Sequence, residues 1–222
     1  MNQTRVLVVD DHAIVRQGIR MLLDTEPSIQ VVGEAGDGKE AVQKAVELQP
    51  DVVLMDLVMP GGGGLEATAE IKRLLPEAKV IILTGFNEKA RAERAVRIGA
   101  DGYLLKDIGG AELIKAIQAV QQGGMPLDPK IASLVLRNVE GGTTRPDLPR
   151  LTAREQRILR LLASGLSNKT IAETLNLRPG TVKVHISNIL HKLHMASRTE
   201  AAIWAMQRDS DLPDTINPVE TN

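Results

Sequence analysis

The chain has 222 residues, enough for two domains, and its hydrophobic content of 43% and charged content of 25% are ordinary for a soluble globular protein. Cysteine is absent, which excludes disulfides and thiolate metal sites, and no apolar run approaches the roughly 18 residues of a membrane-spanning helix. The first residues lack the apolar core of a signal peptide, so we expect a cytoplasmic protein with no membrane partner.

Charge is unevenly distributed along the chain, although the formal net charge is only −1. Residues 145–208 carry eleven Lys/Arg against four Asp/Glu. Residues 1–144 carry sixteen against twenty, and residues 209–222 carry four acids and no base. This asymmetry predicts that only the basic segment binds a polyanion.

Short apolar runs alternate with stretches of helical periodicity through the first half of the chain. The expected strands are 5–9, 29–32, 52–55, 79–83 and 102–105, and the expected helices are 13–23, 37–48, 65–75, 87–98 and 111–122. Five strand–helix pairs predict an α/β fold, a flavodoxin-like doubly wound sheet of five parallel strands with helices on both faces.

Polar residues stand where four of the expected strands end. Because the carboxyl ends of parallel strands meet at one edge, where ligands bind in such folds, we expect these side chains to converge. They are Asp10, Asp11, Asp56, Thr84 and Lys106. Asp56 taken alone would be a helix cap or a solvated loop acid. The complete set favours a functional site.

The chemistry of this set points to phosphoryl transfer. Three close carboxylates repel one another, and a hard divalent cation such as Mg²⁺ relieves that repulsion. One carboxylate can then attack phosphorus, while a hydroxyl at Thr84 and a cation at Lys106 stabilise the charge of the transferred group. The alternative is a salt-bridged acidic cluster beside an unrelated Thr and Lys.

Four helices are expected in the second half, which predicts an all-α helix-turn-helix domain. Thr152 and Glu155 form a capping box for the first helix, and Ser167 caps the second. The third helix, at about 180–193, has an apolar stripe and an opposite face that is polar, basic and free of acids, which fits the DNA major groove. The alternative is a solvated face on a protein-binding module.

A Gly/Pro/Thr-rich stretch separates the two halves. We expect a first domain over residues 1–123, a linker with a short helix at 131–139 over residues 124–149, the helix-turn-helix domain over 150–208, and a disordered tail over 209–222.

Residues 5–122 resemble the receiver domain of bacterial two-component response regulators. The matching stretches are Val-Val-Asp-Asp-His, Leu-Met-Asp-Leu-Val-Met-Pro, Ile-Leu-Thr-Gly and Gly-Ala-Asp-Gly-Tyr-Leu-Leu-Lys-Asp. The resemblance implies that Asp56 accepts a phosphoryl group from a sensor histidine kinase. It implies Mg²⁺ ligands at Asp11, Asp56 and the Val58 carbonyl, with Asp10 acting through a metal-bound water.

The same resemblance assigns three residues to phosphate binding and switching. Lys106 would be the phosphate partner, and Thr84 and Tyr103 would be the switch pair. A plain core or surface aromatic is the alternative for Tyr103. The four glycines after Pro60 depart from the family pattern and predict mobility beside the acceptor.

Residues 151–206 resemble the LuxR-type helix-turn-helix of the NarL/FixJ response regulators. The matching stretches are Leu-Thr-Ala-Arg-Glu, Ser-Asn-Lys-Thr-Ile-Ala, Thr-Val-Lys-Val-His, Lys-Leu and Ser-Arg-Thr-Glu-Ala. The implied base-facing residues are Lys183, Val184, Ser187 and Asn188. The implied phosphate contacts are Ser167, Lys169, Thr181, His185 and Lys192. The implied dimer contacts on the last helix are Ile203, Trp204 and Met206, of which Trp204 fits packing inside its own domain equally well.

These patterns together predict a transcriptional response regulator, switched by Mg²⁺-dependent phosphorylation of Asp56. We expect it to bind double-stranded promoter DNA as a homodimer when activated, to act with RNA polymerase, and to catalyse only its own phosphoryl transfer and dephosphorylation. Two alternatives from other classes are an enzyme that hydrolyses small phosphate esters through Asp56 and a constitutive DNA-binding protein with an inert receiver.

Overall fold

The computed structural model describes residues 3–59, 63–85, 94–95, 97–128, 151–193, 195 and 197–207. The strands are β1 (Thr4–Val9), β2 (Ile29–Ala35), β3 (Val52–Asp56), β4 (Lys79–Thr84) and β5 (Gly102–Leu105). The helices of the first domain are α1 (Ala13–Leu23), α2 (Gly38–Leu48), α3 (Gly64–Leu74) and α5 (Gly110–Gln121). The helices of the second domain are α7 (Ala153–Ala163), α8 (Asn168–Thr174), α9 (Pro179–Leu193) and α10 (Arg198–Gln207).

Several expectations fall on residues outside these ranges. They are Pro60, Gly61 and Gly62 of the glycine loop, most of the helix expected at 87–98, the linker helix expected at 131–139, His194, and the tail at 209–222. None of the helices in the described part of the chain combines the length and hydropathy that a membrane crossing requires.

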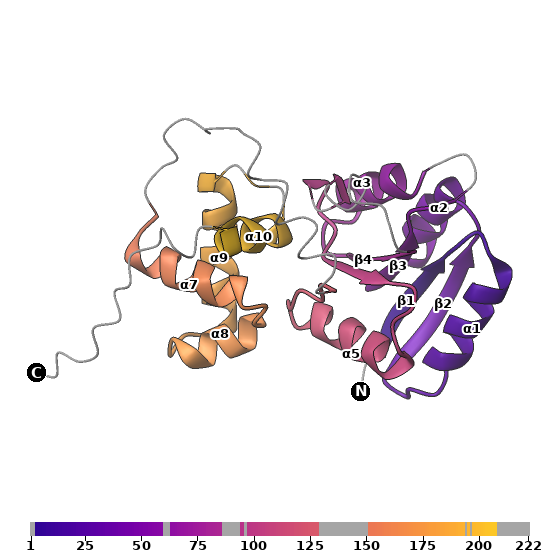
Figure 1. Cartoon of the computed structure of the whole chain (residues 1–222), viewed down its shortest axis with the longest axis horizontal. Helices are drawn as coiled ribbons and strands as arrows, with labels where there is room; N and C mark the ends of the chain where they lie inside the picture. Colours follow the sequence, from indigo (N-terminus) through magenta and orange to yellow (C-terminus); the bar gives the residue numbers. More distant parts are fainter. Residues whose placement is uncertain are drawn as a thin grey trace, which may run out of the picture.

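The five strands form one parallel sheet in the order β2-β1-β3-β4-β5, which confirms the predicted flavodoxin-like topology. Alternate residues of β3 face opposite sides, because side chains in a strand alternate with a period of two. Val53 and Met55 join the apolar cluster under α2 and α3, whereas Val52 and Leu54 join the cluster under α1 and α5. Helices thus cover both faces of the sheet (Figure 1).

β2 is three residues longer than its apolar run predicted. Its pairing with β1 shifts after Val6, so that Leu7 lies opposite Gly33 and the pairing continues to Ala35. Glu34 lies in this extension and binds Arg16 and Arg20 on α1 at 3.3 and 2.6 Å. Pairing with a neighbouring strand therefore overrides the weak strand propensity of the Gly-Glu pair.

The second domain packs four helices around one apolar cluster, as predicted. Its first helix begins with the expected capping box, in which the Thr152 side chain accepts from the Glu155 backbone and the Glu155 side chain accepts from the Thr152 backbone. On α9 the residues Val182, Ile186 and Ile189 are buried in the cluster. This burial turns the polar side of α9 outward.

The two domains contact each other through α10, which lies on the side of the helix-turn-helix domain nearest the receiver (Figure 1). Ile203 is only 4% exposed and belongs to the apolar cluster of the first domain. The Thr199 hydroxyl donates to the Ala100 carbonyl at 3.1 Å, and Lys183 of α9 lies 3.2 Å from Glu77. We call this arrangement, in which α10 is packed against the first domain, the closed arrangement.

Candidate functional site

The ends of three strands bring a lysine and two carboxylates into direct contact. Asp10 follows β1, Asp56 ends β3, and Lys106 follows β5. The Lys106 ammonium lies 2.6 Å from Asp10 Oδ2 and 2.7 Å from Asp56 Oδ2. Asp10 and Asp56 are 2% and 1% exposed. Residues up to about 100 positions apart in the sequence thus meet at one edge of the sheet, which we call the acidic edge.

The surroundings of the two partners shift their pKa values in the same direction. Burial raises the pKa of Asp56, and it outweighs the Lys106 ammonium and the Val58 N–H, which both lower it. Burial lowers the pKa of Lys106, but hydrogen bonds to Asp10 and Asp56 outweigh it, so that its pKa is raised. Lys106 therefore stays a cation beside a carboxylate that is more basic than an exposed one.

A second group of ligand atoms lies at the start of the loop after β1. Asp10, Asp11 and His12 each offer one atom, all within 4.8 Å of one another, which is the spacing of a metal site. His12 Nδ1 lies 2.8 Å from Asp11 Oδ1, and Arg16 donates to the Asp10 carbonyl at 2.6 Å. Sequence reasoning assigned no role here to His12 or Arg16, although their place directly after the two acids was a usable signal.

Thr84 and Tyr103 lie on neighbouring strands, and both are buried. The Thr84 hydroxyl is fully buried and has no hydrogen-bond partner among the described residues. An unsatisfied buried hydroxyl costs about 1–3 kcal/mol, so this atom fits a ligand better than a core position. Tyr103 is 1% exposed and packs in the cluster under α2 and α3.

Two glycines allow close backbone contacts at the start of α3, one with the end of β3 and one with α2. A Cβ on Gly64 would meet the Asp56 carbonyl and lie 2.8 Å from Leu57 Cα, and a Cβ on Gly38 would lie 2.5 Å from the Gly63 carbonyl oxygen. A side chain at Gly64 would push α3 away from Asp56, and one at Gly38 would push α2 away from the start of α3. From the sequence Gly64 indicated only a mobile loop, and Gly38 fell inside an expected helix, because close backbone approach leaves no local signal.

The outward face of α9 carries the residues that the sequence placed on DNA. Thr181, Lys183, Val184, Ser187 and Asn188 are exposed on it, and His185 is half-buried. Lys169 on α8 is exposed as well, whereas the Ser167 hydroxyl is occupied as the cap of α8 and accepts from Thr170 N. Lys192 lies 2.8 Å from both carboxylate oxygens of Glu155, which ties it to its own domain.

The expected dimer contacts on α10 have three different surroundings. Ile203 is covered by the first domain, Trp204 packs partly buried against the cluster of its own domain, and Met206 is exposed. A single helix thus contributes to both domains.

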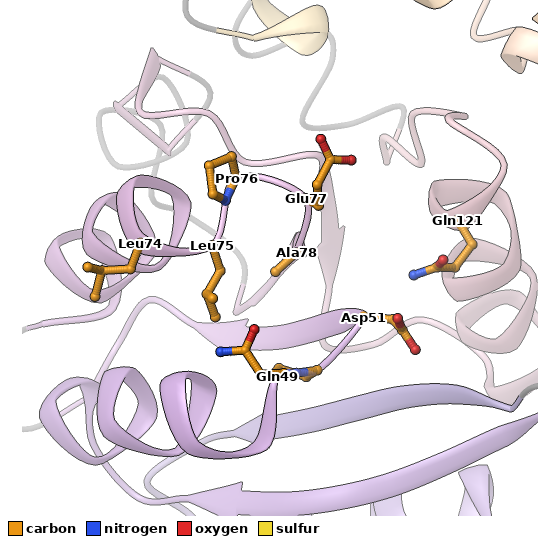
Figure 2. Close-up of a pocket in the computed structure, with 9 residues that line it drawn as sticks. Gln49, Asp51, Leu74, Leu75, Pro76, Glu77, Ala78 and Gln121 are labelled. Carbon is orange, nitrogen blue, oxygen red and sulfur yellow. The ribbon is translucent and has the colours of Figure 1, made fainter. Parts of the chain in front are cut away.

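A shallow hollow of about 360 Å³ lies far from this chemistry, at the opposite edge of the sheet. Gln49, Asp51, Pro76 and Gln121 line it together with neighbouring residues (Figure 2). Asp51 directly precedes β3, the strand that Asp56 ends, so the length of β3 separates the hollow from the acidic edge. Nothing in its lining resembles a catalytic set, and we assign it no role.

Comparison with known proteins places both halves of the chain. Residues 6–118 match the response regulator receiver domain, and residues 149–205 match the bacterial regulatory proteins of the luxR family. The chain is 46% identical over 202 residues to the transcriptional regulatory protein LiaR of Bacillus subtilis, covering 90% of this chain and 96% of LiaR. It is 42% identical over 205 residues to the response regulator VraR of Staphylococcus aureus, covering 92% and 97%.

Solved structures give the same result. The response regulator ChrA of a heme-sensing two-component system is 37% identical with a TM-score of 0.53, over 94% of this chain and 99% of ChrA. RcsB, in a structure of two dimers bound to two parallel DNAs, is 28% identical with a TM-score of 0.56, over 93% and 99%. The chain therefore belongs to the two-component response regulators that join a receiver domain to a LuxR-type DNA-binding domain.

Proposed function

We propose that phosphorylation of Asp56 by a sensor histidine kinase switches this transcription factor from the closed arrangement to a DNA-binding dimer. The observation that carries the proposal is the acidic edge, where Lys106 joins Asp10 and Asp56 beside the Thr84 hydroxyl, which has no hydrogen-bond partner in the described part of the chain. A structural salt bridge would need the lysine and a carboxylate, but it gives no reason for a buried hydroxyl without a partner.

In the proposed transfer, an Asp56 carboxylate oxygen attacks the phosphorus of a phosphohistidine. The new O–P bond forms as the N–P bond to the kinase imidazole breaks, and the imidazole leaves with the electron pair of that bond. Lys106 stabilises the charge on the equatorial oxygens, and Thr84 donates its hydroxyl to one of them. The same residues then hold the acyl phosphate through charge-assisted hydrogen bonds.

We propose that Mg²⁺ binds at the acidic edge, because carboxylate and carbonyl oxygens are the ligands it prefers. Asp11, Asp56 and the Val58 carbonyl would hold it, and Asp10 would act through a bound water. The cluster of ligand atoms at Asp10, Asp11 and His12 fits an ion at this place. When bound, the ion neutralises negative charge on the transferred group.

The closed arrangement suggests how the unphosphorylated protein is kept inactive. Ile203, one of the proposed dimer contacts, is buried against the receiver, so α10 cannot serve two partners at once. The base-facing side of α9 stays exposed, and on it only Lys183 is described with a partner in the receiver, the exposed Glu77. We therefore place the main block at the dimer helix and only a minor one at the recognition helix.

In the DNA-binding state, Lys183, Val184, Ser187 and Asn188 would read base edges in the major groove. Lys169, Thr181 and His185 would contact phosphates. Met206 and the released Ile203 would form the dimer contact, with Trp204 supporting α10 from within its domain. A promoter-bound dimer would then act with RNA polymerase, in the cytoplasm that holds both.

Intact mass and DNA binding, measured on the same samples, test the proposal. After incubation with acetyl phosphate and Mg²⁺, the wild type should gain one phosphoryl group and bind promoter DNA more tightly, and Asp56→Asn should do neither. Asp51→Asn is the matched control, because it removes a carboxylate directly before the strand that Asp56 ends. Equal phosphoryl uptake by wild type and Asp56→Asn would contradict the assignment, and unchanged DNA affinity after uptake would leave an inert receiver on a constitutive DNA-binding protein.

A further inference from the structure

Four residues that lie shortly after α5, beyond the turn at residues 122–124, pair with the edge of the receiver sheet. We call Met125, Pro126, Leu127 and Asp128 the strap. Tyr103 N donates to the Pro126 carbonyl at 2.8 Å, and Asp128 N donates to the Tyr103 carbonyl at 2.9 Å. These two bonds make a parallel bridge between Tyr103 and Leu127. Since β5 lies at the edge of the sheet, the strap satisfies backbone groups that would otherwise face solvent.

Glycines make this path possible. α5 ends in a left-handed turn at Gly123, with φ at +73°, and Gly124 N donates back to the Ala119 carbonyl at 2.7 Å. A Cβ on Gly123 would lie 2.9 Å from Asn168 Nδ2 of the second domain. A Cβ on Gly102 would lie 2.7 Å from Pro126 Cγ. The chain is therefore pressed against β5 on one side and against α8 on the other.

The strap also reaches into the DNA-binding domain. Met125 is buried in the apolar cluster of that domain, and Leu127 packs against the clusters of both domains. Close by, Arg198 at the start of α10 donates to the Leu166 carbonyl and to Asn168, and its burial lowers its pKa to about 10. The strap thus touches the receiver through its backbone and the other domain through its side chains.

We propose that the strap is the element that couples the receiver to α10. While it is paired with Tyr103, Met125 and Leu127 hold the second domain where Ile203 and Thr199 meet the receiver. When the strap separates from Tyr103, α10 separates from the receiver at the same time. The proposal rests on the proposed function, because it supplies the step between the phosphorylated acidic edge and the dimer helix.

The strap can couple the domains only if its two hydrogen bonds to Tyr103 are present in the closed state and absent in the open state, because only an interaction that differs between two states shifts the equilibrium between them. A movement of Tyr103 that follows phosphorylation would change both strap bonds, because both are made by the Tyr103 backbone. Loss of a single such bond should shift the ratio of open to closed molecules by about fivefold, from a typical net hydrogen-bond contribution.

The decisive experiment compares Asp128→Pro with Asp128→Ala in the full chain without phosphodonor. Both variants lose the Asp128 side chain, but only proline also removes the N–H that donates to Tyr103. Asp128→Pro should bind promoter DNA about fivefold more tightly than Asp128→Ala, show a larger radius of gyration by small-angle X-ray scattering, and exchange the Tyr103 amide hydrogen faster. Equal radii of gyration and equal exchange rates of the Tyr103 amide in the two variants would overturn the proposal that the strap couples the domains.

A second pair guards against a folding defect. Gly102→Ala adds a methyl group that Pro126 must give way to, whereas Gly18→Ala adds one on α1 where nothing lies within 4 Å. Gly102→Ala should open the chain and Gly18→Ala should not, with urea midpoints measured for both. Failure of the wild type to take up a phosphoryl group would defeat the proposed trigger and leave the opening of Asp128→Pro intact, so the two proposals fail separately.

Discussion

Two lysines in this protein show how differently its two working surfaces are built. Lys106 lies in the acidic edge with buried carboxylates on two sides, at 2.6 and 2.7 Å. Lys183 lies on the outward face of α9, is 70% exposed, and has one exposed partner, Glu77, at 3.2 Å. The first is part of a buried ion cluster in which each charge is stabilised by its neighbours. The second is a solvated charge on the face that we propose binds DNA.

Because the acidic edge is buried and the outward face of α9 is exposed, the two surfaces should respond differently to substitution. Buried ion pairs are costly to break, because the remaining charge cannot return to water. Exposed pairs contribute little and are screened by salt. Changes at the acidic edge should therefore alter the stability of the fold, and changes on α9 should alter the affinity for DNA and its salt dependence.

The largest effect is expected from Lys106→Met, measured by urea unfolding in the presence of a metal chelator. It leaves Asp10 and Asp56 buried without a cation, which should lower the free energy of unfolding by about 3–5 kcal/mol. The pKa of Lys106 is raised in the fold, so its contribution is present below the ordinary Lys value of about 10.4 and is lost as pH rises through the raised pKa. The variant should regain stability when Asp10→Asn is added, and a lack of recovery would show that the ion cluster is not the cause.

Glu155→Gln should destabilise the DNA-binding domain by about 1–3 kcal/mol, since it weakens the capping box and leaves Lys192 without its carboxylate. Burial raises the pKa of Glu155, but hydrogen bonds from Lys192 and Thr152 outweigh it and lower the pKa. The stabilisation is therefore present above the ordinary Glu pKa of about 4.3 and is lost as pH falls through the lower folded value.

Thermal unfolding between pH 3 and 7 checks this second prediction. The gap between wild type and Glu155→Gln should narrow below about pH 4, and the exposed Glu173→Gln should serve as a control with no gap. A gap that stays constant down to pH 3 would mean that the charge of Glu155 is not what stabilises the domain.

Thr84→Val should have two effects of opposite sign, a gain in stability and a loss of the response to phosphorylation. The Thr84 hydroxyl is buried and has no hydrogen-bond partner within the described ranges, so replacing it by a methyl group should raise the stability of the unphosphorylated protein by about 1 kcal/mol. The phosphorylated variant should lose most of its gain in DNA affinity, since it cannot donate to the phosphoryl oxygen. Urea midpoints and DNA titrations with and without acetyl phosphate measure the two effects. A destabilised variant would indicate that the hydroxyl already has a structural role.

Lys183→Ala should leave stability unchanged and weaken DNA binding by about three- to tenfold, a change of roughly 1 kcal/mol. If Lys183 contacts a phosphate, the slope of log affinity against log salt should fall by about one. If it reads a base, specificity should fall and the slope should change less. Fluorescence anisotropy at several salt concentrations separates these outcomes, and Lys192→Ala should instead lower the stability of the domain.

Local patterns in the sequence determined the elements of both domains. Apolar periodicity located the described strands and helices to within a few residues, and the capping box at Thr152 and Glu155 marked the start of α7. The acids, threonine and lysine at strand ends indicated the acidic edge before any contact was known. Such signals survive in the sequence because they arise from free energies that act within one or two turns of the chain.

Contacts between residues that are far apart in the sequence became visible only in the tertiary structure. Lys192 was predicted from the sequence as a phosphate contact, and the structure adds an ion pair with Glu155, 37 residues away. Gly64 reads as loop, but it is required for the approach of α3 to Asp56. The burial of Ile203 and the strap on Tyr103 have no local signal at all. They depend on crossovers and domain docking that join residues far apart in sequence, whereas propensities and caps act only between near neighbours.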